Sequence, residues 1–223
     1  MISDNFRSLA SATDKLISSP FALISLSGNS RELYLSYLAA TCHIIRSSVD
    51  LMILALSSCP VEADENFLTY LEKHIEEERE HYQWALEDLQ SATAHSELFL
   101  ARTFRTEVIS VPGIAYYQVR NFTPYAVLGY MLALESNPPA VDLVTGLPHK
   151  TSLASSAFRT VLVHAEADIE HSAEIYKLID VMFPQTEAGP AITAIGSTLI
   201  MTNVAYAAAC RAWMSDSEFQ REL

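Results

Sequence analysis

Apolar side chains recur about every 3.6 residues along almost the whole chain, and the alternation typical of strands is rare. This period predicts an all-α protein of about seven helices with short connections. Proline and glycine give the expected boundaries, because neither favours a helix interior. Pro60 separates two long helices, residues 111–113 form a break, and VDLVTGLPHK is predicted as a loop. Thr123 is expected to cap a helix that has Pro124 at its first position. The predicted helices span residues 31–59, 60–92, 96–107, 124–136, 151–182 and 189–214, with the segment IAYYQVRNF after the central break.

The chain of 223 residues is long enough to bury its own core, and we assign residues 1–223 to a single seven-helix bundle. Half of the residues are hydrophobic and 18% are charged, a composition that excludes wholesale disorder. The 27 acidic residues outnumber the 14 basic ones, so the formal net charge is −13. This charge disfavours nucleic acid and an anionic membrane surface as partners.

Several features favour a cytoplasmic location. The chain has three cysteines, a small and odd number that does not suit a disulfide scaffold, so a reducing compartment fits better. The N-terminal segment MISDNFRSLASATDK carries charges where a signal peptide has its apolar core. The most apolar segment, AITAIGSTLIMTNVAYAAAC, contains serine, threonine and asparagine, and we interpret it as a buried helix.

Two predicted helices carry the same polar motif. It consists of a histidine, an acid four positions after it, and a second histidine seven positions after the first. The two copies are His74, Glu78 and His81, and His164, Asp168 and His171. At about 100° per residue these positions lie within about 60° of one another, so each helix presents two imidazoles and one carboxylate on one stripe. Imidazole and carboxylate suit iron, manganese or zinc. Two such stripes on facing helices of a bundle predict a two-metal site.

The surroundings of the two copies differ. The first lies in EKHIEEEREH, a charged run that is typical of a solvated helix face, and Glu77 is an alternative to Glu78 there. The second follows FRTVLV, whose apolar residues predict that His164 faces the core. A buried Asp168 without a partner would be costly, which favours a nearby cation. Glu135, the acid that ends AVLGYMLALE, is either an exposed residue at a helix end or a further ligand.

The segments HIEEEREHYQWALEDL and HAEADIEH resemble the haem-oxygenase-like di-iron oxidases and oxygenases. These proteins share the seven-helix fold of haem oxygenase and of thiaminase-like (TenA) proteins but bind two non-haem irons. The resemblance covers residues 34–182, and its most diagnostic motif is matched by the second copy of the motif described above. His81 matches the histidine of the family's first metal-binding helix, and Glu135 matches a glutamate ligand. Some members have a glutamate at the position of His74 and others an acid at that of Glu78, so the ligands from this helix stay open.

The resemblance implies the cofactors and the chemistry. It implies two ferrous ions, with O2 as co-substrate, held by His74, Glu78, His81, Glu135, His164, Asp168 and His171. Family members act on small amino-acid-like or fatty-acid substrates. The implied function is therefore the oxidation of a small, amino-acid-derived substrate in specialised metabolism, by N-oxygenation, C–C cleavage or desaturation. The expected partner is this small molecule, and a homodimer is left open.

Five residues outside the motifs are candidates for substrate contact. They are His43, Arg46, Tyr116, Tyr130 and Arg159. An arginine on an otherwise apolar helix can bind a substrate carboxylate through two parallel hydrogen bonds. Arg46 can equally pair with Asp50, four positions later on the same helix.

Two other functions compete with the oxygenase. A TenA-like hydrolase would need a cysteine nucleophile, which here would be Cys42 or Cys210, and it would leave both metal-binding stripes unexplained. A ferritin-like metal-binding protein would use the stripes without a substrate. Metal content and the chemistry of the pocket distinguish these alternatives.

Overall fold

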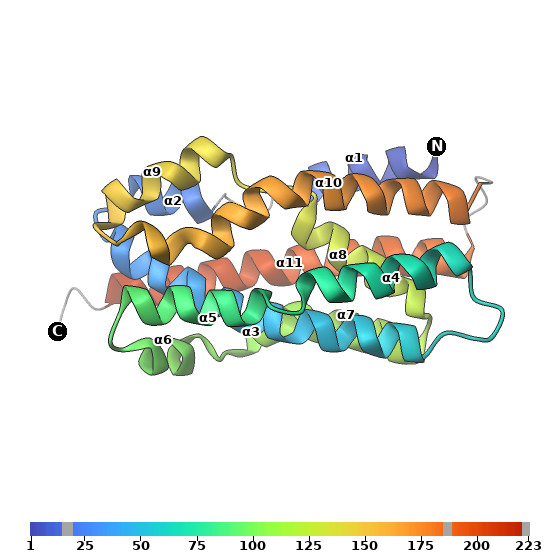
Figure 1. The fold of residues 1–223 in the computed structure, drawn as a ribbon, viewed down its shortest axis with the longest axis horizontal. Coiled ribbons are helices and arrows are strands. Elements are labelled where there is room, and N and C mark those ends of the chain that lie inside the picture. Colours follow the sequence, from blue (N-terminus) through green and yellow to red (C-terminus); the bar gives the residue numbers. More distant parts are fainter. Residues whose placement is uncertain (15–19, 185–188, 220–223) are drawn as a thin grey trace.

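The structure is a computed structural model that describes residues 1–14, 20–184 and 189–219. These residues form eleven α-helices and two 3-10 turns without any strand (Figure 1), so the predicted all-α class is confirmed and the predicted number of helices is wrong. The helices are α1 (Ile2–Asp14), α2 (Pro20–Leu26), α3 (Ser30–Ser57), α4 (Glu65–Glu78), α5 (His81–Ala92), α6 (Ser96–Thr103), α7 (Thr106–Asn121), α8 (Val127–Glu135), α9 (Val141–Thr151), α10 (Arg159–Met182) and α11 (Pro190–Phe219). The 3-10 turns are Pro124–Ala126 and Ser155–Phe158.

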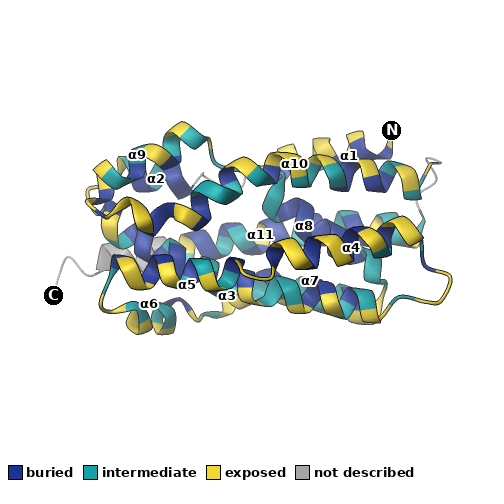
Figure 2. Ribbon diagram, in the orientation of Figure 1, coloured by how far each residue is buried: buried dark blue, intermediate teal, exposed yellow. Residues whose placement is uncertain are grey.

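The long helices run along the long axis of the molecule (Figure 1). α11 packs against α3, α7 and α8, and α10 packs against α4, α5, α8 and α9. The short helix α8 lies at the centre of this arrangement, and residues 127–133 of α8 are all buried. The outer helices have one buried and one exposed face (Figure 2), as expected for amphipathic helices around a single core.

The helix predicted for residues 60–92 is interrupted. It begins at Glu65, where the Asp64 side chain caps it by accepting hydrogen bonds from the backbone N–H groups of Asn66 and Phe67. It then breaks at residues 79–80 into α4 and α5, although neither proline nor glycine marks this position. Residues 76–80 are all charged and provide no apolar side chain to hold a continuous helix against the core.

Four helices cover segments that were not predicted to be helical. α7 continues through Pro112 and Gly113, and α9 covers VDLVTGLPHK with Pro148 inside it. In α7 the residues Val108, Val111, Pro112, Ala115 and Val119 form a continuous buried stripe, so packing outweighs the hydrogen bond that proline removes. α1 and α2 extend the fold at the N-terminal end. Thr123 precedes Pro124 in extended conformation as predicted, but its side chain makes no cap hydrogen bond.

Two helices are long and apolar enough, by length and composition, to span a membrane. They are Ser30–Ser57 and Pro190–Trp213, and about half of the most apolar window of each is buried inside the bundle (50% and 44%). A core helix of a bundle has the same properties. The central position of α11 agrees with our interpretation of residues 191–210 as a buried helix, and the cytoplasmic location stays a prediction.

α8 and α11 approach each other closely at Gly129. A Cβ atom on residue 129 would lie 2.2 Å from the Ile195 carbonyl oxygen and 2.9 Å from the Leu199 backbone nitrogen. Backbone atoms in a close-packed core cannot move aside without shifting a whole helix. Because α8 ends at Glu135, this contact also determines where the Glu135 carboxylate lies.

We expect Gly129→Ala to lower the free energy of unfolding by about 1–3 kcal/mol or more, the usual cost of overpacking a core. Urea unfolding followed by circular dichroism measures this loss. Gly113→Ala is the matched control, because Gly113 is an exposed helical glycine with nothing within 4 Å of the position that a Cβ atom would take. It should be stabilising by about 0.5–1 kcal/mol. Equal effects of the two substitutions would contradict the close α8–α11 contact.

Candidate metal centre

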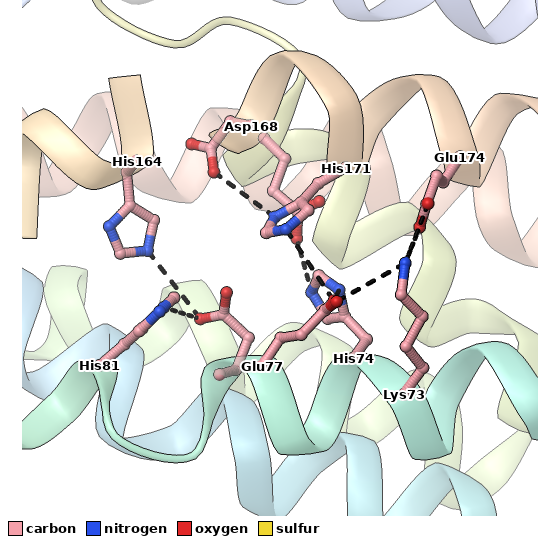
Figure 3. A network of polar contacts seen from close by, with 10 residues as sticks. Lys73, His74, Glu77, His81, His164, Asp168, His171 and Glu174 are labelled. Carbon is pink, nitrogen blue, oxygen red and sulfur yellow. Dashed lines mark hydrogen bonds and ion pairs between the residues drawn. The ribbon is translucent and has the colours of Figure 1, made fainter. Parts of the chain in front are cut away.

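Four histidines and four carboxylates meet between α4, α5, α8 and α10 (Figure 3). They comprise all seven sequence-predicted ligands together with Glu77. Their members are His74, Glu77 and Glu78 from α4, His81 from α5, Glu135 from α8, and His164, Asp168 and His171 from α10. The structure thus brings the predicted residues together, and their role as metal ligands stays a prediction.

Glu78, His81 and His164 form a first group, the His81 cluster. One potential ligand atom from each of the three lies within 4.8 Å of the others. Glu78 Oε2 is 2.7 Å from His81 Nδ1 and 3.9 Å from His164 Nε2. The two imidazole rings lie 4.8 Å apart between centroids, so the predicted packing of these two helices at their histidines is confirmed.

His74, Glu77 and His171 form a second group, the His74 cluster, which meets the same 4.8 Å criterion. Glu77 Oε2 lies 3.6 Å from His74 Nδ1 and 4.0 Å from His171 Nε2. On the other side of the His74 ring, Nε2 lies 3.3 Å from Oε1 of Glu135. The Glu135 side chain is largely buried, so it is not the exposed helix-end residue that the sequence also allowed.

The two copies of the motif supply these clusters differently. In α10 the motif lies on one continuous helix, with His164 in the first cluster, His171 in the second and Asp168 between them (Figure 3). The predicted single stripe of the first copy is wrong, because the chain breaks at residues 79–80 and His81 begins a new helix. Glu77 and Glu78 are neighbours on α4 whose side chains diverge by about 100°, so they lie in different clusters and are not alternatives to each other.

A hydrogen-bonded chain orients the His164 ring. His164 Nδ1 lies 2.8 Å from the Thr160 carbonyl oxygen, to which it donates, so Nε2 is left facing Glu78. The Thr160 backbone N–H in turn donates to Oδ2 of Asp88 at 2.7 Å. Asp88 is buried on α5 and lies seven positions after His81, on the same helix face. That spacing was a signal for Asp88 that the sequence interpretation missed.

Burial and neighbouring charges shift the pKa values of this centre. Burial raises the pKa of Asp168 to about 8, although the nearby His164 opposes the shift. Burial lowers the pKa of His164, but the hydrogen bond to Glu78 and the charges of Asp168 and Glu78 outweigh it and raise that pKa to about 9. Burial alone would raise the pKa of Glu78. The hydrogen bonds and charges of His164 and His81 have the larger effect and hold that pKa well below its usual range.

Several buried polar atoms of this centre have no hydrogen-bond partner among the described residues. They are His74 Nδ1, Glu135 Oε2, Asp168 Oδ1 and His171 Nδ1. Unpartnered buried polar atoms are costly, and a metal ion is the partner that imidazole nitrogen and carboxylate oxygen share. The residues present therefore fit a pair of transition-metal ions.

Tyr70 is a further member that sequence reasoning missed. Its ring stacks on His74 with 5.5 Å between centroids, and its buried hydroxyl has no hydrogen-bond partner within the described part of the chain. Burial, and then the charge of Glu135, raise the pKa of Tyr70 far above its usual value, so the hydroxyl stays protonated. Tyr70 lies four positions before His74, a spacing that places both on one helix face.

A cavity of about 710 Å³ adjoins the centre. Five of the eight clustered residues line one part of it, namely His74, Glu78, Glu135, His164 and Asp168. The other walls come from α2, α3, α8, α9, α10 and α11, and from the segment between α8 and α9. This volume is typical of small-molecule sites.

Of the five candidates for substrate contact, Tyr130 lines this cavity. Its hydroxyl lies 2.8 Å from Oγ of Ser48, which lines the cavity too. The other four are not among the lining residues. His43 Nε2 bonds the Leu100 carbonyl oxygen at 2.9 Å, and the Arg46 guanidinium lies 5.7 Å from the centre of the Tyr82 ring.

The remaining two candidates have local partners. The Tyr116 hydroxyl donates to the Ser47 carbonyl oxygen at 3.2 Å. The exposed Arg159 pairs with Glu87 at 2.8 Å. The cavity therefore offers no support for substrate contact by His43, Arg46, Tyr116 or Arg159, and contact by Tyr130 stays a prediction.

The raised pKa values predict how the stability of the metal-free protein depends on pH. The pKa of His164 rises from 6.5 in the unfolded chain to about 9 in the folded protein. Its contribution to folding stability is therefore complete below pH 6.5 and is lost as the pH rises to 9. The pKa of Asp168 rises from 3.8 in the unfolded chain to about 8 in the folded protein. Folding stability therefore also falls as the pH rises from 3.8 to 8, because only the unfolded chain ionises freely there. The melting temperature in a chelator should therefore fall by at least about 3 °C between pH 6.5 and pH 9, which for this chain length corresponds to about 1 kcal/mol.

Asp168→Asn should reduce this slope and raise the melting temperature at pH 8, because the buried charge is removed. Asp142→Asn, on the exposed face of α9, changes the net charge equally and is the control. A slope that is the same in all three proteins would show that the cluster does not determine it.

Comparison with known proteins defines the fold. The sequence matches no protein-family profile and no curated protein. A domain of unknown function with a haem-oxygenase-like fold from Shewanella denitrificans superposes with a TM-score of 0.81 at 18% identity, over 99% of this chain and 95% of that one. A TenA homolog from Pseudomonas syringae pv. tomato superposes with a TM-score of 0.66 at 9% identity, over 93% of each chain. At these identities the likeness concerns the fold alone, and the chain has the haem-oxygenase-like fold that TenA proteins share.

Proposed function

We propose that this protein is a non-haem di-iron oxygenase or oxidase that uses O2 to oxidise a small organic substrate, by N-oxygenation, C–C cleavage or desaturation. The observation that carries this proposal is the pair of histidine–carboxylate clusters on either side of Asp168, at the wall of a cavity large enough for a substrate. Imidazoles and carboxylates that project inward from facing helices are how bundle proteins build two-metal centres.

In this proposal the residues would divide between two ions. Glu78, His81 and His164 would hold one ion, and His74, Glu77 and His171 the other, with Glu135 as a further carboxylate on the other side of the His74 ring. Asp168 lies between His164 and His171 on α10 and would supply a further carboxylate to the centre. When bound, the two ferrous ions would supply the electrons that O2 needs to react with an unactivated substrate.

The protein's own part is to orient the ligands and to keep water out. The Thr160 carbonyl fixes the tautomer and the direction of His164, as carbonyl partners commonly do for ligating histidines. Apolar side chains of α3 and α8, such as Ile45 and Met131, form the cavity wall beside the centre and exclude water from it. The Tyr130 and Ser48 hydroxyls are the polar groups through which this wall can position a substrate.

A hydrolase that uses a cysteine nucleophile is disfavoured. Burial raises the pKa of Cys42 to about 12 and that of Cys210 to about 12, so both thiols are protonated at neutral pH. Neither cysteine is among the residues that line the cavity. A ferritin-like storage role would leave the adjoining cavity without a purpose.

Anaerobic reconstitution with Fe(II), metal counting and Mössbauer spectroscopy test the proposal. We expect close to two irons per chain, in two distinguishable environments because the clusters differ in composition. The ferrous protein should then consume O2 in a limited amount per chain. Continuous oxidation and accumulation of many irons per chain would instead indicate storage, and reconstituted protein without iron would refute the proposal.

The ligand set makes a sharper prediction. Asp168→Ala, His164→Ala and His171→Ala should abolish assembly of the two-iron centre, since each change removes a buried ligand and leaves others unbalanced. Glu78→Ala should lose the ion of the His81 cluster, whereas Glu77→Ala should weaken the other ion less, because the Glu77 side chain is 38% exposed. Even neighbours of ligands change metal affinity by about 10–100-fold.

Glu76→Ala is the matched control. Glu76 lies on α4 among the same charged residues, but it is exposed and pairs with Arg79. Its loss should leave two irons per chain, and helicity by circular dichroism should be unchanged in every variant, because apolar faces hold the helices together. Two irons per chain in Asp168→Ala would contradict the proposed ligand set.

A further inference from the structure

The surface that α7 and α11 form together exposes a group of apolar side chains. On α7 and directly after it, Ile109, Tyr117 and Phe122 are exposed, and the Tyr117 and Phe122 rings lie 5.9 Å apart between centroids. On α11, Ile200 and Val204 are exposed one helical turn apart. Because α7 and α11 pack against each other, these five side chains belong to one surface, the α7–α11 face.

A groove of about 540 Å³ marks the boundary between the two helices on this face. Ile109, Gly113 and Tyr117 of α7 line it at intervals of one turn, and Met201 of α11 lines its other side. Gly113 is exposed, and nothing lies within 4 Å of the position that a Cβ atom would take. Glycine weakens a helix interior, and no contact within the described chain requires one here. The groove therefore leaves room for side chains of a second molecule.

Helix α11 lacks the charged outer side that is usual for a surface helix of a bundle. It has no charged residue from Pro190 to Cys210, although the chain has a formal net charge of −13. One side of α11 packs against α3, α7 and α8, and the middle of its exposed side is formed by Ile200 and Val204. A helix that is apolar on both sides is normally buried on both sides. The exposed side of α11 thus has the composition of a covered surface.

The size of the α7–α11 face suits a contact between proteins. Tyr117 is 61% exposed and Phe122 is 66% exposed. An aromatic side chain can bury roughly 150–250 Å², so these two rings alone offer about 200–300 Å². Ile109, Ile200 and Val204 add to this area. The total suits the apolar centre of an interface, whose standard size is about 800 Å² per partner including its polar rim.

The charges at the two ends of α7 make the face complementary to itself. Glu107 lies six positions before Gly113 and Arg120 lies seven positions after it, and both are exposed. Neither forms an ion pair within the described part of the chain. If two copies of α7 pack antiparallel about a two-fold axis at Gly113, each Glu107 comes level with the Arg120 of the other copy, because each residue advances the helix by about 1.5 Å. A parallel pair would instead bring like charges together.

These features favour a second copy of the chain over a membrane as the occupant of the face. A helix that lies on a membrane has several lysines or arginines beside its apolar side. On α7 the single Arg120 is balanced by Glu107, and α11 has no basic residue before Arg211. An anionic lipid surface would also repel a chain of net charge −13. Two copies repel each other as well, but contact through a face without net charge keeps their charged surfaces apart.

We propose that this protein is a homodimer in which the α7–α11 faces of two copies pack against each other, with the two α7 helices antiparallel about Gly113. The groove of each copy then receives apolar side chains of the other, and the exposed side of α11 becomes covered. Neither α7 nor α11 contributes a residue to the His81 or the His74 cluster. The dimer is therefore independent of the proposed di-iron function, and metal-free protein can be used to test it.

Sedimentation velocity of the full-length protein over a range of concentrations tests the dimer. We expect a dimer that dissociates on dilution. Val204→Glu and Tyr117→Glu should each weaken dimerisation more than tenfold, because each buries two unpaired carboxylates at the interface. Val181→Glu is the matched control and should leave the dimer unchanged. Val181 is 53% exposed against 48% for Val204, and it lies on α10, on the other side of the bundle from α7 (Figure 1).

Charge reversal tests the antiparallel arrangement. Glu107→Arg alone and Arg120→Glu alone should each weaken dimerisation about tenfold, because each change replaces two attractive pairs by two repulsive ones. The double variant restores opposite charges at both ends of α7. Its dissociation constant should return to within threefold of that of the unmodified protein. A double variant as weak as the single ones would contradict the antiparallel pairing.

Cross-linking tests the position of the two-fold axis. Gly113→Cys should form a disulfide between two copies under mild oxidation, because residues on the axis meet their own counterparts. Gly146→Cys is the control, since Gly146 is a helical glycine of α9 with equally open surroundings, and it should not cross-link. Both changes are made together with Cys59→Ser, because Cys59 is only half-buried.

A monomer at every concentration would overturn the inference, and so would a dimer that both glutamate variants of the face leave unchanged. Monomeric protein that floats with phosphatidylcholine vesicles would show that the face binds a membrane, and would overturn it too. Circular dichroism verifies the folding of each variant. The two glutamate substitutions lie on different helices, so one serves if the other does not fold.

Discussion

The burial of several ionisable side chains in one small volume is the constraint on which this structure depends. Glu78, His81 and Asp168 are almost inaccessible to water, and an uncompensated charge there would cost more than most single packing contacts provide. The surrounding helices relieve part of this cost through the Glu78–His81 hydrogen bond and through protons retained on Asp168 and His164, as their raised pKa values indicate. The remainder falls on atoms that have no hydrogen-bond partner within the described residues, such as Oδ1 of Asp168. A bound cation would compensate the buried negative charge and would also give the unpartnered atoms a partner.

Two features of the helices put these side chains in place. Glu77 and Glu78 are the neighbouring residues of α4 before the break, and because their side chains diverge by about 100° they face different clusters; the break then starts α5 at His81. The close approach of α8 to α11 at Gly129 then sets the depth at which Glu135 enters from the opposite side. The centre is thus assembled from irregular features at two helix ends together with one regular helix, α10.

The sequence predicted those parts of the molecule that depend on local periodicity. The all-α class, the long helices α3, α10 and α11, and the inward-facing motif of α10 follow from apolar residues at helical spacing. It did not predict that α7 and α9 continue through proline, because tertiary packing of a buried stripe decides that outcome. The break at residues 79–80 was missed because no proline or glycine marks it. Local spacing alone also could not reveal that Arg46 and Arg159 lie away from the cavity, since their partners come from distant elements.

The two clusters are chemically similar but differ in their access to solvent. The His81 cluster combines a buried glutamate with an imidazole that is oriented by a backbone carbonyl. In the His74 cluster, Glu77 is 38% exposed and also lies 3.5 Å from Nζ of Lys73, which pairs with Glu174 across α4 and α10. Water and the lysine therefore compete for the Glu77 carboxylate, whereas no such competitor is within reach of Glu78 among the described contacts. An ion in the His74 cluster would exchange more readily for this reason, whereas the cavity adjoins both clusters, through Glu78 and His164 of the first and through His74 and the nearby Glu135 of the second.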